Sequence, residues 1–109
     1  MTYQHKELAS GRWFQIPFLE QIANIGTEVM RAITWKKKNY NYSIKAVERA
    51  LELIDLTAAD AKNKKRLKEI LRMREVLVDY FYFDNQYGSS DELWNSYFAP
   101  FFHIVSKDK

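Results

Sequence analysis

The sequence predicts an all-α protein: an antiparallel four-helix bundle with an irregular N-terminal arm over residues 1–16 and a kinked last helix. Apolar side chains recur at helical spacing in four segments of the 109 residues. The connections between these segments are short, which places consecutive helices side by side. Three glycines and two prolines are too few for the many tight turns of an all-β fold. At this length we expect one domain, residues 1–109, with a single core.

Composition excludes several classes of protein. Hydrophobic residues make up 47% and aromatic residues 16% of the chain, which is too apolar for a disordered protein. Cysteine is absent, so disulfides, thiolate metal sites and a cysteine nucleophile are excluded. No apolar run reaches the roughly 20 residues that span a bilayer, and the N-terminus lacks the hydrophobic segment of a signal peptide. We therefore expect a cytoplasmic protein with no membrane partner.

The N-terminal arm contains two adjacent aromatic residues, Trp13 and Phe14, shortly before Pro17. We expect both rings to anchor the arm on the helical body; an exposed hook that binds a partner is the alternative interpretation. Pro17 suits the first turn of a helix, where a missing N–H has no partner to lose. The first helix then runs to the lysines at 36–38, which complement the negative end of its dipole rather than form a phosphate site.

Gly26 lies inside the apolar face of the first helix, whose other members are Phe18, Leu19, Ile22, Ile25, Val29, Ala32 and Ile33. We expect it to let a neighbouring helix approach closely rather than to end this helix. The second helix follows a turn at 39–42, with Ser43 as its N-cap. Its apolar stripe is Ile44, Val47, Ala50, Leu51, Ile54 and Ala58. A row of carboxylates lines the edge of that stripe: Glu48, Glu52 and Asp55.

Arg74 is the unusual residue of the third helix, which is predicted over residues 64–85. On a helical wheel it lies among apolar residues, namely Leu67, Ile70, Leu71, Leu77, Val78 and Phe81. A buried guanidinium must be paired, because an unpaired buried charge costs several kcal/mol. We therefore predict a structural buried charge, in which Arg74 pairs with carboxylates of neighbouring helices: Glu28, Glu48 or Asp55. Asp79 is predicted to lie on the polar face.

The last helix is predicted to begin with a capping box, in which Ser89 is the N-cap and Glu92 follows three residues later. Its apolar residues are Leu93, Trp94, Tyr97, Phe98, Phe101, Ile104 and Val105. Pro100 should kink this helix or end its regular part, because proline removes a backbone hydrogen bond.

Candidate catalytic groups are few. Neither His5 nor His103 has the glutamate three residues earlier that a carboxylate-bridged metal bundle uses. No nucleophile elbow or phosphate loop occurs. We therefore predict no metal, no cofactor and no small-molecule ligand, and the sequence favours a non-catalytic protein over an enzyme. His103 is expected to be exposed.

A dense basic cluster precedes the third helix: Lys62, Lys64, Lys65, Arg66 and Lys68. Cations are disfavoured at the N-terminal end of a helix, so local stability does not require them there. A solvated patch is the favoured interpretation, and a nucleic-acid or acidic-protein contact is the alternative. The net charge of +3 is too small to decide between them. The aromatic run at 80–83 covers every side of its helix, so we expect the last helix to bury some of it and a homodimer contact to bury the remainder.

Over most of its length the chain resembles a group of short prokaryotic proteins of unknown function. The stretches that carry the resemblance are GRWF at 11–14, NIGTEV at 24–29, ERALEL at 48–53, REVLVDYFY at 74–82 and DNQYG at 84–88. This resemblance implies a four-helix bundle and no particular activity.

A second resemblance lies in the third helix. Arg74, followed five residues later by Asp79 and then by Tyr80 and Phe81, is similar to the Arg-x4-His motif of HEPN domains. These are small helical bundles, often dimeric, and many are ribonucleases of toxin–antitoxin pairs with a nucleotidyltransferase. Asp79 stands at the position of the catalytic histidine, and a carboxylate cannot supply a cation to a developing phosphorane charge. The resemblance therefore implies a protein that has lost the ribonuclease chemistry.

Together these observations favour a non-catalytic helical-bundle interaction module that self-associates, as a homodimer. The alternative is a HEPN-like nucleic-acid-binding or RNA-processing protein of a toxin–antitoxin type system. A nucleic acid or another protein is then the expected partner.

Overall fold

The computed structural model describes residues 11–107, and this part of the chain is all-helical. The all-α prediction is therefore confirmed for these residues, and four α-helices pack against one another. The elements are η1 (Arg12–Gln15), α2 (Phe18–Trp35), α3 (Tyr40–Ala59), η2 (Ala61–Arg66), α4 (Leu67–Tyr82) and α5 (Asp91–Lys107). Residues 1–10 of the predicted arm, with His5, lie outside the described residues. From residue 11 to residue 107, no helix is both long and apolar enough to cross a bilayer.

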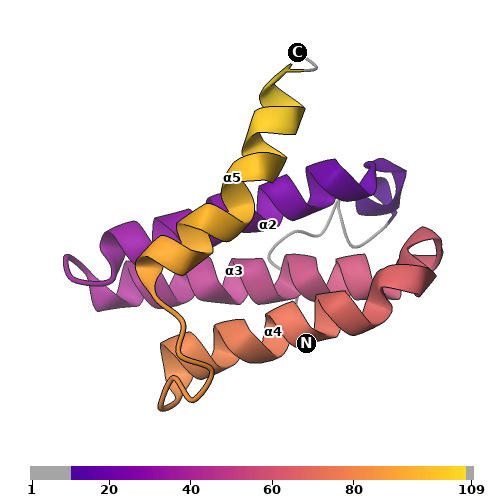
Figure 1. Ribbon diagram of the computed structural model, residues 1–109. Coiled ribbons are helices and arrows are strands. Elements are labelled where there is room, and N and C mark those ends of the chain that lie inside the picture. Colours follow the sequence, from indigo (N-terminus) through magenta and orange to yellow (C-terminus); the bar gives the residue numbers. More distant parts are fainter. Residues whose placement is uncertain (1–10, 108–109) are drawn as a thin grey trace.

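Three of the helices lie side by side, and the fourth crosses them (Figure 1). α3 lies between α2 and α4, packs on both, and runs in the opposite direction to each. α5 packs on α2 at a steep angle, so its C-terminal end projects away from the other helices. α5 thus departs from the predicted antiparallel alignment.

Gly26 explains where α5 crosses α2. A Cβ atom added to this buried glycine would lie 2.7 Å from two ring atoms of Phe98 and 2.8 Å from Phe102. Carbon atoms normally approach only to about 3.5–4.0 Å. The prediction that Gly26 allows a neighbouring helix to approach closely is therefore confirmed, and that helix is α5.

The core lies mainly between α2 and α3, and the predicted stripes of these two helices fill much of it: Ile22, Ile25, Val29, Ala32, Val47, Ala50 and Ile54. The buried face of α4 is narrower and includes Ile70, Met73 and Leu77. Leu67 and Leu71, which were predicted on this face, are 38% and 45% exposed. The reason is that α4 lies at the edge of the layer, where α3 is its main helical neighbour.

The first turn of α3 begins earlier than the sequence predicted. Asn39 is the N-cap, because its side-chain oxygen accepts the backbone N–H of Tyr42 at 3.2 Å. Ser43, the predicted cap, is buried inside the helix and donates its hydroxyl to the carbonyl of Ala32 at 2.7 Å. This serine therefore joins α3 to α2 instead of starting α3.

The predicted ends of the last two helices also shift. Residues 61–66 form a 3-10 helix before α4, and α4 ends at Tyr82. The hydroxyl of Ser90 accepts the N–H of Leu93 at 3.1 Å, so Ser90 takes the capping role predicted for Ser89. α5 continues as a helix through Pro100, and its predicted kink stays a prediction.

A buried polar corner fixes the arm to the helices. Trp13 is 1% exposed, and its indole N–H donates to Thr57 Oγ1 at 3.0 Å. Gln21 donates to the backbone carbonyl of Trp13 at 3.1 Å and accepts from Asn63 at 2.9 Å. The predicted anchoring by Trp13 is therefore confirmed. Phe14 is 37% exposed, so the same prediction is wrong for this ring.

Candidate functional site

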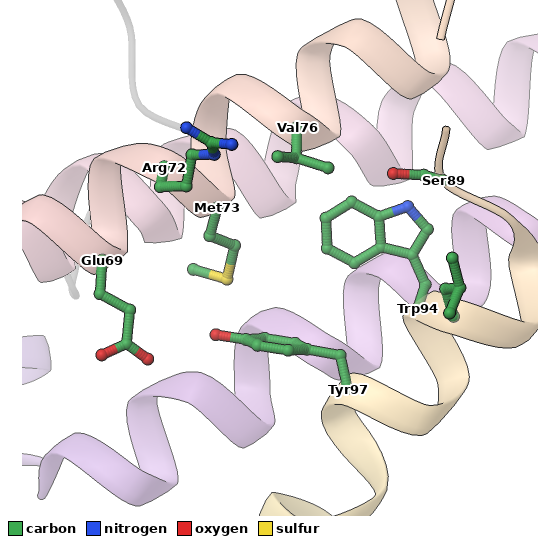
Figure 2. A pocket seen from close by; sticks show the side chains of 8 residues that line it. Glu69, Arg72, Met73, Val76, Ser89, Trp94 and Tyr97 are labelled. Atoms are coloured by element: carbon green, nitrogen blue, oxygen red, sulfur yellow. The ribbon is translucent and has the colours of Figure 1, made fainter. Parts of the chain in front are cut away.

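An apolar cleft of about 230 Å³ separates α4 from α5. Figure 2 shows side chains of the two helices facing each other across it. The cleft exists because α5 packs on α2 at Gly26 and so leaves α4 incompletely covered. Its lining comes from α4, the following loop and α5: Glu69, Arg72, Met73, Val76, Ser89, Leu93, Trp94 and Tyr97.

Tyr97 and Arg72 are polar side chains of the cleft, and each has surroundings that affect its charge or its position. Burial raises the pKa of the Tyr97 phenol, and the charge of Glu69 raises that pKa further. Tyr97 therefore stays protonated and uncharged at neutral pH. The Arg72 guanidinium lies 4.6 Å from the centre of the Tyr87 ring, a distance at which a cation is attracted to the ring face.

Trp94 forms one wall of the cleft and stacks on Phe98, with ring centres 5.9 Å apart. Only 5% of its surface is exposed. Its indole nitrogen is buried and has no hydrogen-bond partner among the described residues. Figure 2 shows this nitrogen and the Ser89 hydroxyl at the same end of the cleft. A buried donor left without an acceptor costs about 1–3 kcal/mol, so such groups are rare in folded proteins.

The loop between α4 and α5 is held in place by two side chains. The two carboxylate oxygens of Asp79 accept the backbone N–H groups of Gln86 and Tyr87, each at 3.0 Å. Asn85, in the left-handed conformation with φ of 53°, exchanges two hydrogen bonds of 2.8 Å with the backbone of Ser89. These bonds fix the position of Ser89 at the edge of the cleft.

Arg74 was predicted to be buried and Asp79 to lie on the polar face, and the structure shows the reverse. The Arg74 side chain is 40% exposed and pairs with the 53% exposed side chain of Asp55 at 2.8 Å, whereas Asp79 is only 8% exposed. Asp55 is thus the partner, but the predicted burial of the pair is wrong, because α4 turns only a narrow face to the core. Asp79 is buried because the loop after α4 folds back over it.

The two other predicted partners of Arg74, Glu28 and Glu48, differ in how far they are buried. Glu28 is buried, but it pairs with Arg31 at 3.0 Å and Arg49 at 3.1 Å. Glu48 is exposed, so its predicted burial is wrong. Burial, and then the charge of Glu48, raise the pKa of Tyr82, which places this carboxylate near the end of α4.

The predicted basic cluster lies on η2 and the first turn of α4, and all five side chains are exposed. Lys62 forms an ion pair with Asp60. The guanidinium of Arg66 lies 4.3 Å from the centre of the Phe18 ring. Two of the five side chains, those of Lys62 and Arg66, therefore bind other groups of this protein. The remaining cations of the cluster are the exposed lysines 64, 65 and 68.

A second apolar surface, which we call the aromatic end, consists of Trp35, Tyr40, Tyr42, Tyr82 and Phe83. These residues belong to the end of α2, the start of α3 and the end of α4, which Figure 1 shows at the same end of the three-helix layer. Their exposed fractions range from 38% to 71%. The rings of Trp35 and Tyr42 meet edge to face, with centres 5.1 Å apart. Half of the aromatic run at 80–83 is therefore exposed.

Lys36, Tyr80 and Asp91 form a polar cluster where α2, α4 and α5 meet. Lys36 donates to Asp91 at 2.8 Å and to the Tyr80 hydroxyl at 3.0 Å, and Tyr80 donates to Asp91. Burial acts to lower the pKa of Lys36, but the hydrogen bonds to Asp91 and Tyr80 outweigh it and raise that pKa. The cluster ties the start of α5 to the rest of the protein.

His103 is exposed. Between residues 11 and 107, no three histidine or acidic side chains come close enough together to hold a metal ion. The cleft itself was not predicted, because it depends on the angle between α5 and α4, which helical periodicity does not encode.

The resemblances to short prokaryotic proteins and to HEPN domains stay predictions. A scan of protein-family models, a search of curated proteins and a search of solved structures each found no match to this chain.

Proposed function

We propose that this protein is a non-catalytic, cytoplasmic interaction module that self-associates through its aromatic end. The observation that carries the proposal is the exposure there of Phe83, at 71%, and Tyr40, at 65%. Large apolar groups gathered on a surface mark a contact with a partner more often than a surface that stays in water.

The size of the aromatic end suits a dimer interface. Aromatic side chains bury about 150–250 Å² each, so five of them exposed by 38–71% offer on the order of 500 Å². A standard interface takes about 800 Å² from each partner, and the flanking residues can supply the rest. They carry both signs of charge: Lys37 and Lys38 follow α2, Glu48 lies in α3, and all three are exposed. A two-fold contact can therefore set opposite charges against each other.

Sedimentation velocity over a range of micromolar concentrations tests this proposal. We expect the parent to dimerise, and the double variant Tyr40→Lys/Phe83→Lys to be monomeric with an unchanged melting temperature. Leu71→Lys is the matched control, because Leu71 is an exposed apolar residue of α4 outside the aromatic end, and this variant should dimerise like the parent. A parent that remains a monomer at high micromolar concentration contradicts the proposal.

The alternative function is nucleic-acid binding of HEPN type. Its support is the exposure of the lysines at 64, 65 and 68. The resemblance also needs Arg74 and position 79 to act together. Arg74 instead pairs with Asp55, and Asp79 is occupied by the N–H groups of the following loop. Self-association is therefore the better supported function.

A further inference from the structure

We infer that the Phe83 ring of each copy enters a hollow between α2 and α5 of a second copy, so that the α4 end of one copy lies on the α2 end of the other. This pairing rests on the proposed self-association through the aromatic end. It adds a second surface to that contact and names the group that occupies it.

The hollow has a volume of about 450 Å³. Five residues of α2 and one of α5 line it: Thr27, Met30, Arg31, Thr34, Trp35 and Phe102. A cavity of about 150 Å³ holds benzene, so one phenyl ring fits here together with part of the backbone that carries it. Trp35 also belongs to the aromatic end, so the two surfaces are continuous.

The polar side chains of the hollow already have partners within α2. The hydroxyls of Thr27 and Thr34 donate to the carbonyls four residues earlier, at 3.1 Å and 2.9 Å. The Arg31 guanidinium pairs with Glu28 at 3.0 Å, and a guanidinium can at the same time lie over an aromatic ring. The rest of the lining is one methionine and two aromatic rings, which make favourable contacts with another ring. A phenylalanine ring, which needs no hydrogen bond, therefore suits this lining.

Phe83 has the exposure and the position that the pairing needs. At 71% it is the most exposed large hydrophobic side chain among residues 11–107. It directly follows α4, and its backbone is extended. Figure 1 shows the α2 end and the α4 end at the same end of the three-helix layer, with α3 between them. A two-fold axis beside the start of α3 therefore sets the α4 end of each copy against the α2 end of the other.

The charges at the two helix ends favour this arrangement. Lys37 and Lys38 follow α2, Asp84 follows Phe83, and all three charged side chains are exposed. In the two-fold contact the lysines of one copy lie near the aspartate of the other, and the same pairing occurs twice. A contact of two α2 ends would instead bring the lysines of both copies together, which is unfavourable.

The hollow also supplies interface area. The five rings of the aromatic end offer on the order of 500 Å², whereas a standard interface takes about 800 Å² from each partner. A ring that fills the hollow covers Met30 and Phe102, which are both partly exposed. These walls therefore provide part of the area that the aromatic end lacks.

Thr34→Arg tests whether the hollow takes part in the contact. The new side chain fills the hollow with a charge and leaves all five rings of the aromatic end in place. Asn24→Arg is the matched control, because Asn24 is also exposed on α2 and also donates to the carbonyl four residues earlier. In sedimentation velocity we expect Thr34→Arg to weaken dimerisation by at least about tenfold and Asn24→Arg by less than about twofold. Both melting temperatures should stay close to that of the parent.

An exchange of charges tests which ends meet. The variant Lys37→Glu/Lys38→Glu and the variant Asp84→Lys should each dimerise poorly alone, because like charges then meet. Mixed in equal amounts, they should form a heterodimer, because both contacts then join opposite charges. Native mass spectrometry distinguishes the three possible dimers. Lys65→Glu/Lys68→Glu makes the same change of charge away from the aromatic end, and it should remain a homodimer when mixed with Asp84→Lys.

Two results would each overturn the pairing while leaving self-association in place. One is a Thr34→Arg variant that dimerises as well as the parent. The other is an exchanged mixture that shows no preference for the heterodimer. A parent that stays monomeric at high micromolar concentration would overturn the pairing and the proposed function together. If Thr34→Arg does not fold, the exchange of charges still decides, because it changes only exposed side chains.

Discussion

The carboxylate of Asp79 accepts the backbone N–H of Tyr87 at 3.0 Å, across the loop that joins α4 to α5. Its other oxygen accepts the N–H of Gln86 at the same distance. A charged acceptor that is 8% exposed and satisfies two backbone donors contributes more to stability than a surface ion pair. Asp79 therefore fixes the first part of the loop after α4, and Asn85 fixes the part nearer α5 through its two bonds to Ser89.

We expect Asp79→Ala to lower the free energy of unfolding by about 2–4 kcal/mol, because two backbone N–H groups lose a charged acceptor. Arg74→Ala should lower it by less than about 1 kcal/mol, because its pair with Asp55 is solvent-exposed. Urea melts of both variants measure the difference. Asp79→Asn, which keeps one acceptor, should fall between Asp79→Ala and the parent. A larger loss for Arg74→Ala would restore the sequence-based prediction of a buried charge.

Gly26→Ala should destabilise the protein by about 1–3 kcal/mol, because the new Cβ would overlap the Phe98 ring. In an ordinary helix the same change stabilises by about 1 kcal/mol, so the sign of the effect reports the crossing of α5 over α2. Thermal or urea melts provide the measurement. Thr27→Ala, at the next and exposed position of α2, is the control and should change stability little. A stabilised Gly26→Ala variant would show that α5 does not pack there.

Stability should depend on pH through Asp91. Burial acts to raise the pKa of Asp91, but hydrogen bonds from Lys36 and Tyr80 outweigh it and lower that pKa below its usual 3.8. The contribution of this carboxylate is therefore present above about pH 3.8 and is lost as the pH falls through the folded-state pKa. The side chains of Lys36 and Asp91 are 32% and 37% exposed, so we expect the loss to stay near 1 kcal/mol.

Urea melts of the parent and of Asp91→Asn at a series of pH values test this dependence. The difference in stability between them should be constant near neutral pH and should shrink below pH 3.8. Glu92→Gln is the control, because Glu92 is exposed and lies outside the cluster. If the difference between the parent and Asp91→Asn does not change with acidification, Asp91 has no special role in stability.

The buried corner gives a fourth prediction. Trp13→Phe keeps an aromatic ring but removes the donor to Thr57 Oγ1, so we expect a loss of about 1–3 kcal/mol. Phe14→Leu, at the exposed neighbouring position, should change stability by less than about 0.5 kcal/mol. Equal effects of the two substitutions in urea melts would mean that the arm is not anchored through Trp13.

The alternative function gives a fifth prediction, which concerns salt. If the exposed lysines at 64, 65 and 68 bind RNA, affinity should fall steeply with added salt, because each phosphate contact releases counterions. Changing all three lysines to glutamine should flatten that dependence, while the same change at the three exposed lysines 37, 38 and 45 serves as a control for total charge. Fluorescence anisotropy with a labelled single-stranded RNA measures both. An absence of micromolar binding at low salt would remove this function.

The sequence by itself determined the all-α class, the cores of α2 and α3, the contact role of Gly26 and the anchoring by Trp13. Each of these follows from local rules. A helix repeats every 3.6 residues, so apolar spacing identifies the face that it buries. A glycine within that face leaves room for another helix, and a large ring shortly before a helix start needs a place to be buried. The same rule did not tell Trp13, which is 1% exposed, from its neighbour Phe14, which is 37% exposed.

The tertiary structure alone decided the environments of Arg74 and Asp79 and the existence of the cleft. The width of the face that α4 buries depends on how many helices cover it. Because α4 lies at the edge of the layer, Arg74 stays at the surface. Asp79 is buried by backbone N–H groups seven and eight residues later, which carry no side-chain pattern. The cleft results from the steep angle at which α5 crosses α2, because α5 then leaves part of α4 uncovered.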